Sequence, residues 1–448
     1  MRPVLRVTLA GLALTAGLLT GLASAASFSI SEMGSRASGR GYAVAALYDN
    51  PSTIYYNPAN ISRLEGVQLD LGATAIMPRW QWSPVYGSEP GEKTKSETGM
   101  VPPPSFSATY NIGNPGQGDM AVGLGVYVPF GSTFAWPEDW AGRGDIQKIA
   151  LQVIEVAPAI AWRPAKELSI GATFRYMPSQ VYLKQAIVLP EGEGDIELAG
   201  GGTGYGASVG IGIYPNDRTS LALTWRSGTT IALKGDSDIT LPAPFDASAV
   251  DRDVTADLPL PYELRFGIAY EAIPQKLMLS ADVNYQMWEV YKSLDITFTN
   301  PDGSKELVSK ARDSHDTVSL HLGAEYMVSD VLALRAGYVF DQMSLPEATV
   351  NAAPPDSNKH VATVGASYFF GDFGVHAHFE NVFFQPRTSR TAEFPGRWKG
   401  GYEAGTMAYV AGLSFSAAFD VAGVFPSMNA TADHHMTGLA PIASTVGE

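Results

Sequence analysis

Three short stretches carry residue types whose spacing could support chemistry. "GASVG", residues 206–210, matches the G-x-S-x-G pattern that presents a nucleophilic serine on a strand-to-helix turn. His376 and His378 would lie on one face of a strand with Glu380 beyond them, as ligands of a metal ion could. "GGGTGYG", residues 200–206, has the glycine content of a loop that binds phosphate.

The surroundings argue against each of these functions. Ser208 is expected inside an alternating strand, where Tyr205, Ala207, Val209 and Ile211 share the opposite face, so it cannot sit on a strand-to-helix turn. The glycine-rich run has no βαβ context, and we interpret the histidines as part of a hydrated polar network. We therefore expect no enzyme and neither a metal nor a cofactor.

The elements around these stretches show a period of two. In "YELRFGIAY", Tyr262, Leu264, Phe266, Ile268 and Tyr270 alternate with polar residues and glycine. The same pattern recurs in "GVQLDLGATAIM", "MAVGLGVYV", "LSIGATFRY", "LALRAGYVF" and "MAYVAGLSFSAAF". The chain is therefore predicted to be all-β, with one apolar and one polar face on each strand.

The connections fall into two classes that alternate along the chain. The short ones are "NIGNPGQGD", "RPAKE", "YPNDR", "AIPQK", "VSD" and "GDFG"; the long ones are roughly 78–100, 131–148, 181–203, 235–257, 299–313, 344–358 and 385–404. Six short and seven long connections predict a 14-stranded antiparallel transmembrane β-barrel, because such barrels have tight turns at one end and long loops at the other. A soluble β-sandwich would also alternate, but its strands are shorter and its turns are not sorted in this way.

The first residues of the chain and its composition agree with an outer-membrane location. Residues 1–25 combine Arg2 and Arg6, an apolar run and Ala23-Ser24-Ala25, which is the pattern of a cleaved signal peptide. The chain has 448 residues and no cysteine, so it does not depend on disulfides. Its formal net charge is −15, which argues against nucleic acid as a partner. We expect a multi-pass protein of a Gram-negative outer membrane, surrounded by lipid and lipopolysaccharide.

The segment before the first strand has a different character. Residues 26–66 do not alternate and contain two Asn-Pro pairs, in "YDNPSTIYYNPANISRLEG". A barrel of fourteen strands encloses a lumen that its wall side chains do not fill, so this segment is predicted to form a plug inside it. The barrel would then span residues 67–419, and residues 420–448 would form a periplasmic tail.

Several stretches together resemble the FadL/TodX family of outer-membrane transporters for long-chain fatty acids and other hydrophobic compounds. The N-terminal stretch "SISEMGSRASGRGYAVAALYDNPSTIYYNPANIS" is similar to the family's hatch, with Asn57, Pro58 and Ala59 as its most specific part. "VPFGSTFAWPEDWAGR", "DLPLPYELRFGIAY", "LSADVNYQMW" and "LRAGYVFDQMSLPEATVNAAPPDSNKHVATVGASY" resemble later strands in the right order. Lys359-His360 departs from the family, which often has an arginine near that point.

The resemblance implies a passive route with a sideways exit. Substrate would be captured by the outer loops, bind inside the barrel near the hatch and leave through a gap in the third strand. Val128, Pro129, Phe130 and Gly131 are the candidates for this exit, because proline cannot donate to the ladder and glycine permits unusual backbone. The alternative is that Pro129 only ends the strand.

Candidates for substrate binding follow from residue type and from the side of the strand on which a residue lies. Aromatic residues of the first two long loops, namely Trp80, Trp82, Phe134, Trp136 and Trp140, would form a capture surface or an aromatic belt at the membrane interface. A fatty-acid carboxylate would need a lumen cation, and the candidates are Arg175, Arg265, Arg335, Lys292 and His321. The sequence leaves open an aromatic hydrocarbon as cargo, and also a general porin or an outer-membrane lipase.

Overall fold

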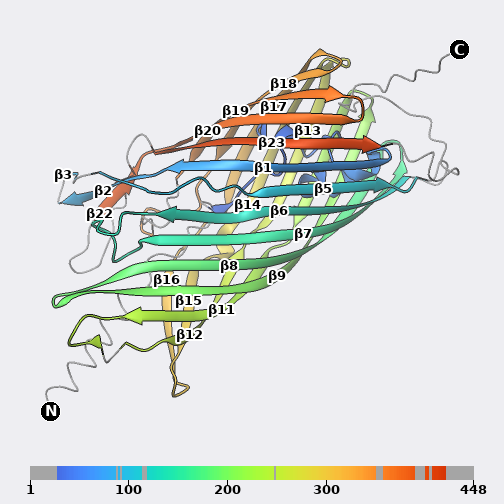
Figure 1. Cartoon of the computed structure of the whole chain (residues 1–448). Coiled ribbons are helices and arrows are strands. Elements are labelled where there is room, and N and C mark those ends of the chain that lie inside the picture. The colour runs from blue at the N-terminus through green and yellow to red at the C-terminus, as the bar shows by residue number, and fades with distance from the viewer. Residues whose placement is uncertain are drawn as a thin grey trace, which may run out of the picture.

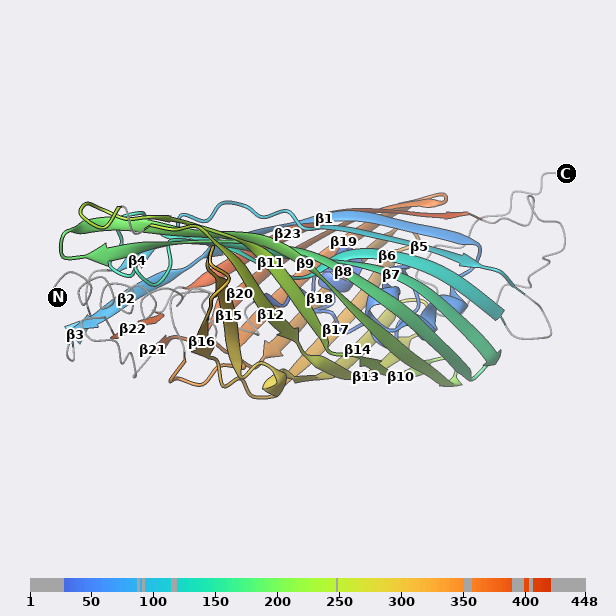
Figure 2. The same ribbon diagram turned by 90° about the horizontal axis from the view of Figure 1, so that it is seen from below.

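The wall of the molecule is a closed ring of strands (Figures 1 and 2). The computed structural model describes residues 28–86, 89–90, 93–113, 119–246, 249–349, 357–388, 399–402 and 406–419. Each strand of the ring pairs antiparallel with its neighbours, and β1 closes the ring by pairing with both β5 and β23. The fourteen strands are β1 (Val67–Arg79), β5 (Pro104–Asn111), β6 (Asp119–Ala135), β7 (Lys148–Ala165), β8 (Leu168–Leu189), β9 (Gly192–Asn216), β10 (Thr219–Arg226), β13 (Tyr262–Ile273), β14 (Leu277–Met287), β17 (Thr317–Ser329), β18 (Leu332–Asp341), β19 (Lys359–Phe370), β20 (Phe373–Phe384) and β23 (Met407–Phe419). The predicted fold class is confirmed.

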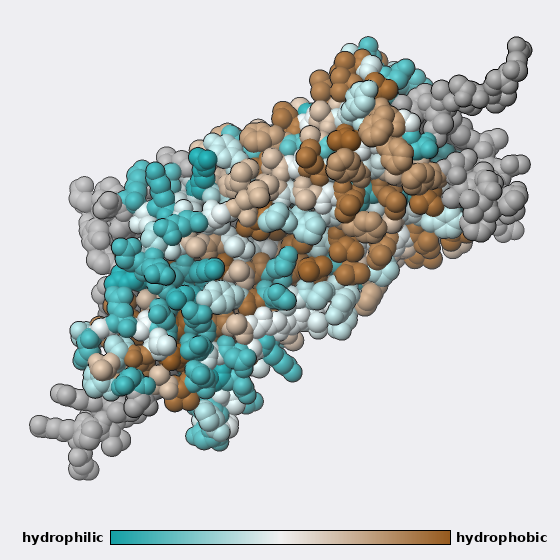
Figure 3. All heavy atoms as spheres, in the orientation of Figure 1, coloured by the Kyte–Doolittle hydropathy of each residue, from teal (hydrophilic) through white to brown (hydrophobic). Residues whose placement is uncertain are grey.

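The faces of the strands follow the predicted alternation. In β13, Tyr262, Leu264 and Phe266 are exposed, whereas Arg265 and Ala269 are buried. Figure 3 shows apolar residues gathered over one half of the molecule and hydrophilic residues at the end where β2 and β3 lie. We expect lipid to surround the apolar half, because a barrel in a membrane turns its apolar face outward. None of the helices in the described part of the chain is long and apolar enough to cross a membrane.

Several predicted long loops are instead extended hairpins. Residues 181–203 were expected to be a loop, but β8 and β9 stay paired from Leu168–Ile213 to Leu189–Gly192. The ladder continues because buried apolar side chains such as Leu183, Ile196 and Leu198 pack against one another above the membrane. Residues 235–257 and 299–313 are also partly strand, within β11 (Thr229–Thr240), β12 (Arg252–Leu260), β15 (Ser293–Thr299) and β16 (Lys305–Ala311).

The remaining strands form a small sheet at the same end. Its members are β2 (Gln81–Tyr86), β3 (Glu89–Pro90), β4 (Thr94–Lys95), β21 (Arg387–Thr388) and β22 (Lys399–Tyr402). A short 3₁₀ helix, η4 (Trp288–Val290), follows β14 and places the fully buried Trp288 against Phe28 and Phe130. The extended hairpins and η4 contribute buried apolar residues to one cluster, so this end of the molecule is a packed apolar structure.

Residues 28–66, called the hatch segment below, lie inside the ring. They contain α2 (Ser35–Ser38), α3 (Thr53–Tyr56) and η2 (Pro58–Arg63), and Figure 2 shows these turns among the strands. The backbone of the hatch segment approaches glycines of the wall closely. A Cβ on Gly171 would lie 2.5 Å from the nitrogen of Ala59, and one on Gly337 would lie 2.3 Å from the nitrogen of Gly41. Glycine on the inner wall therefore makes room for the hatch segment. The predicted signal peptide and C-terminal tail lie outside the described residues.

Candidate functional site: a pocket at the kink of strand β6

Strand β6 loses its alternation in its middle. The pairing with β7 passes from Tyr127–Glu155 to Phe130–Val153, so β6 holds one extra residue there. Tyr127, Val128, Pro129 and Phe130 are all buried, which an undisturbed strand cannot achieve because its side chains alternate. A bulge of this kind bends the strand and interrupts its ladder. The bulge lies within the stretch proposed for the exit, residues 128–131, while the exit itself stays a prediction.

The neighbouring strand also stops at this height. β5 pairs with β6 only from Phe106–Val126 to Asn111–Ala121. Residues 102–104 are three consecutive prolines, which have no N–H to donate to the carbonyl groups of β6. Beyond Val126, the edge of β6 that faces β5 is therefore without a regular strand partner, and the ladder resumes only where the Glu97 nitrogen donates to the Ala135 carbonyl at 2.8 Å.

The beginning of the hatch segment occupies part of this edge. The Ile30 nitrogen donates a hydrogen bond of 2.8 Å to the Pro129 carbonyl, and Ser29 forms an isolated antiparallel bridge with Phe130. Phe28 packs edge-on against Phe130, with ring centroids 5.9 Å apart. Two residues of the N-terminal segment thus substitute for β5 at the kink.

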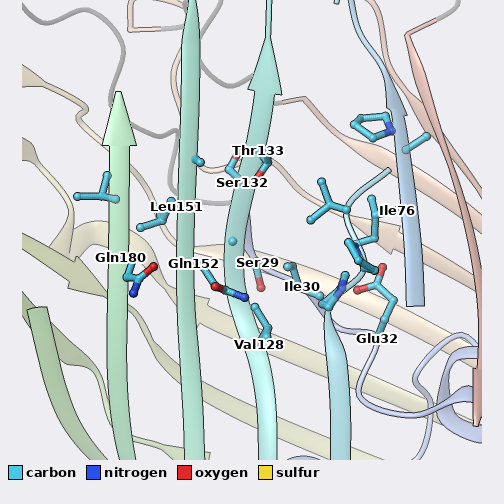
Figure 4. Close-up of a pocket in the computed structure, with 18 of the residues that line it drawn as sticks. Ser29, Ile30, Glu32, Ile76, Val128, Ser132, Thr133, Leu151, Gln152 and Gln180 are labelled. Atoms are coloured by element: carbon cyan, nitrogen blue, oxygen red, sulfur yellow. The ribbon is translucent and has the colours of Figure 1, made fainter. Parts of the chain in front are cut away.

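A pocket of about 740 Å³ opens beside this contact, a size typical of sites for small organic ligands. Figure 4 shows its side chains converging from the hatch segment, β1, β6, β7 and β8. Leu151 is buried in an apolar cluster inside the wall. Its neighbour Gln152 is exposed, as is Gln180, and both occupy the alternating positions of their strands that face outward. The lining therefore includes residues of both faces of the wall. Other lining residues are Ile76, Trp80, Val101, Pro102, Pro103, Val128, Gly131, Ser132 and Thr133.

The charged side chains of the pocket are few among the described residues. Glu32 of the hatch segment and Lys359 of β19 line it, and the Lys359 ammonium already lies 2.8 Å from the carboxylate of Asp341. The Glu32 carboxylate accepts a hydrogen bond of 2.7 Å from the Ser31 nitrogen. The rest of the lining is apolar or neutral, so the pocket suits a largely apolar ligand.

The predicted hatch residues connect the hatch segment to the wall. Asn57 is fully buried, caps η2 by accepting from the Ala59 nitrogen at 3.1 Å and donates to the Ile211 carbonyl of β9 at 3.2 Å. Pro58 begins η2, where a missing N–H costs nothing. A Cβ on Gly210 would lie 1.9 Å from the Asn57 side-chain oxygen, so this contact requires glycine in the wall.

The predicted lumen arginines face inward but do not line the pocket. Arg175 and Arg226 both bind Glu155, at 2.8 and 2.9 Å, and Arg226 also donates to the Tyr55 carbonyl. Arg335 pairs with Glu325, which also binds Arg40 of the hatch segment.

Arg265 completes the set and follows the same pattern. It pairs with Glu263 at 3.3 Å and lies 3.8 Å from Asp282, whose carboxylate accepts from the Val44 and Ala45 nitrogens. Acids of the wall thus hold all three candidate arginines, and the same networks bind the hatch segment.

His321 and Lys292 lie apart from the pocket lining as well. His321 is buried and bonds through its two ring nitrogens to the Gly41 carbonyl and the Ser319 hydroxyl, at 2.9 and 3.0 Å. Lys292 is exposed and donates to the Ser314 carbonyl at 3.0 Å. Both make contacts with the chain itself.

The loop aromatics are buried, which differs from both interpretations given above. Trp136 and Trp140 stack with centroids 4.8 Å apart, and the Trp140 indole donates to the Ile146 carbonyl. Trp80, Trp82 and Phe134 are also at most 9% exposed, so the five side chains form neither an exposed capture surface nor a belt facing lipid. They belong to the same buried apolar cluster as residues of the extended hairpins, and of the five only Trp80 lines the pocket.

The stretches that first suggested chemistry lie within strands of the wall, β9 and β20. Ser208 lies inside β9 and is buried, with Tyr205 and Val209 exposed on the other face as predicted. His376 bonds to Ser367 and Ser416, at 2.6 and 2.8 Å. Sequence reasoning missed the proline triplet, Glu32 and the pair Ser29-Ile30; the triplet in "MVPPPSF" was the one visible signal, because three missing donors in a row exclude an ordinary ladder.

A closed antiparallel barrel with an internal N-terminal segment and a pocket in its wall defines a class: outer-membrane transporters of hydrophobic compounds. The chain belongs to the family described as outer membrane protein transport protein (OMPP1/FadL/TodX), whose model matches residues 16–419.

Relatives and solved structures agree with this assignment. The chain is 27% identical to a 47 kDa outer membrane protein of Pasteurella multocida over 80% of this chain and 87% of that one, and 24% identical to the long-chain fatty acid transport protein of Escherichia coli K12 over 84% and 93%. The fold is similar to a Pseudomonas aeruginosa FadL homologue, with a TM-score of 0.75, 19% identity and coverage of 89% and 100%. It is also similar to the Pseudomonas putida toluene transporter TodX, with a TM-score of 0.70, 18% identity and coverage of 86% and 98%. The family is described as transport proteins, and the Escherichia coli relative is named as one, which supports a role other than catalysis.

Proposed function

We propose that this chain is a passive channel that takes hydrophobic molecules into the pocket and releases them sideways through the wall at the kink of β6. The observation that carries the proposal is the lining of the pocket, which includes residues from both faces of the wall where the ladder between β5 and β6 is interrupted. An apolar chain gains about 0.8 kcal/mol for each CH₂ group removed from water, so no energy source is needed for capture.

The hatch segment makes the sideways route necessary. The ion pair of Arg40 with Glu325 and hydrogen bonds with Asp282, Ile211 and Ser220 fasten it to strands on different sides of the lumen. We infer that it acts as a plug, so cargo leaves through the wall and not along the axis. The pairing of Ile30 with Pro129 then closes the exit at rest, and cargo passes when this contact opens.

Two cargo classes remain within this proposal. Long-chain fatty acids are the class predicted from the resemblance, and one relative is named for them. Aromatic hydrocarbons are the alternative, since a structural neighbour is named a toluene transporter. The arginines expected to hold a carboxylate lie outside the pocket lining, which favours a ligand without an anionic head.

The exit can be tested by restoring the ladder at the kink. In a Pro129→Val, Gly131→Ala variant, residue 129 regains an N–H, and the new Cβ at residue 131 lies 3.2 Å from the Ile30 side chain. We expect uptake of radiolabelled oleate and toluene by whole cells to fall at least tenfold.

The control for this experiment is Gly99→Ala, Pro301→Val. A Cβ on Gly99 meets nothing within 4 Å, and Pro301 lies in an exposed turn. Both variants should reach the outer membrane as folded barrels. Unchanged uptake in the kink variant would remove the exit from this site.

A further inference from the structure

One acid lines the pocket, and two more lie close to its lining residues. Glu32 lines it, and the nearby Tyr42 hydroxyl donates a short hydrogen bond to Glu380 of β20. Asp341 of β18 holds the one cation of the described lining, Lys359 of β19. The cation of the described lining is thus already paired, and Glu32 is the carboxyl group that the lining itself presents, so an anionic ligand head would find no unpaired cation there.

Glu32 is placed to receive a hydrogen-bond donor. It keeps part of its surface accessible, and its carboxylate accepts a hydrogen bond of 2.7 Å from the Ser31 nitrogen. Burial raises the pKa of Glu32, although hydrogen bonds from the backbone and Tyr42 and the attraction of Lys359 oppose this shift. A carboxylate can accept about four hydrogen bonds, so a donor or cation from a ligand would stabilise its charged form.

The groups that face Glu32 come from every element packed there. They are Tyr42 and Tyr56 of the hatch segment, Lys359 of β19 and Glu380 of β20, with His378 3.5 Å from Glu380. Tyr56 is committed to the Ser31 carbonyl at 2.7 Å, and Lys359 to Asp341. Glu32 is therefore the pocket-lining charged group with capacity for a ligand.

We propose that the pocket prefers hydrophobic molecules whose polar end donates hydrogen bonds, as an amine or a hydroxyl group does, and that Glu32 accepts from this end. The proposal rests on the proposed function, because it assigns the ligand class of the same pocket. It also predicts discrimination against carboxylates, since a site with an unpaired acceptor rejects a ligand that brings a second acceptor.

Matched ligands with one alkyl chain test this preference. We would measure binding of radiolabelled dodecylamine, 1-dodecanol, dodecanoate and dodecane to the detergent-purified full chain at pH 8, for the natural protein and for Glu32→Gln. Partitioning into detergent is the same for both proteins, so the ratio of the two Kd values for each ligand reports the site. We expect Glu32→Gln to weaken dodecylamine at least tenfold and dodecanol about threefold, to leave dodecane unchanged, and to leave dodecanoate unchanged or tighter.

A pH series gives an independent readout. Protonation of Glu32 removes its charge, so dodecylamine should bind the natural protein less tightly at pH 5 than at pH 8, while Glu32→Gln shows no such change. Glu138→Gln is the matched control, because Glu138 is exposed and lies outside the pocket lining. It should bind every ligand as the natural protein does.

The outcomes separate the two proposals. If dodecane binds but Glu32→Gln affects all four ligands equally, or weakens dodecanoate most, the preference for donors is wrong and the proposed function stands. If none of the ligands, dodecane included, binds the natural protein, the proposed function fails with it.

Discussion

At the scale of single residues, alternation along a strand predicts that the lumen arginines face inward, but it does not predict what they bind. Their positions on the inner face were predicted from alternation and are confirmed. Their partners were not, because alternation reports a face and not a neighbour: Glu155 of β7 meets Arg226 of β10, which is 71 positions away. Glu32 was missed for a similar reason, since nothing in an irregular segment tells which side chain will reach a pocket.

The network around Glu155 predicts a large loss of stability on substitution. In Glu155→Gln, the buried Arg175 and Arg226 lose their shared carboxylate. Breaking a buried ion pair costs about 3–5 kcal/mol, so we expect the urea midpoint of the refolded barrel to fall sharply. Glu193→Gln is the matched control, because its partner Arg143 and Glu193 itself are partly exposed, and such pairs contribute less than about 1 kcal/mol. Equal midpoints for the two variants would contradict this interpretation.

At the scale of elements, the contact between Ser29-Ile30 and β6 can be held closed by an engineered disulfide. Ser29 and Phe130 form a bridge, and Cα atoms of directly paired residues lie about 4.5–5.5 Å apart, within the range of a disulfide. The chain has no cysteine, so a Ser29→Cys, Phe130→Cys variant offers a single pair. Oxidation should stop uptake, and reduction should restore it.

The single-cysteine variants control for the lost side chains in this experiment. Each should take up cargo equally with and without oxidant. Full uptake by the oxidised double variant, with the disulfide verified by mass, would show that the contact does not have to open.

The element boundaries were predicted well at one end of the barrel and poorly at the other. The tight turns at 166–167 and 217–218 are where the sequence places them, because glutamate, lysine, proline and aspartate interrupt the alternation there. Residues 181–203 are predicted to form a loop because they contain many glycines and acids. They form strands instead, and their buried face is still apolar. Cross-strand packing above the membrane decided their conformation, and that packing depends on distant segments.

At the scale of the whole molecule, the hatch segment predicts how the barrel conducts ions. A chain that lacks residues 26–66 should conduct markedly better in planar bilayers than the intact chain, because a lumen of fourteen strands would be left open. Gly337→Leu tests the same idea without a deletion, since any Cβ there would lie 2.3 Å from the Gly41 nitrogen and displace the segment. Gly99→Ala should conduct as the natural protein does. High conductance of the intact chain would instead indicate a general porin.

The long hairpin of β8 and β9 has a consequence for how the cell surface is presented. Twenty-five residues of β9 extend roughly 80 Å, whereas the apolar band of such barrels is only about 25 Å tall. Even when tilted, the hairpin is therefore long enough to project beyond the lipid. Because such barrels carry their longer connections on the outside of the cell, we expect its tip at residues 190–191 to be among the first parts that an antibody or a bacteriophage would touch.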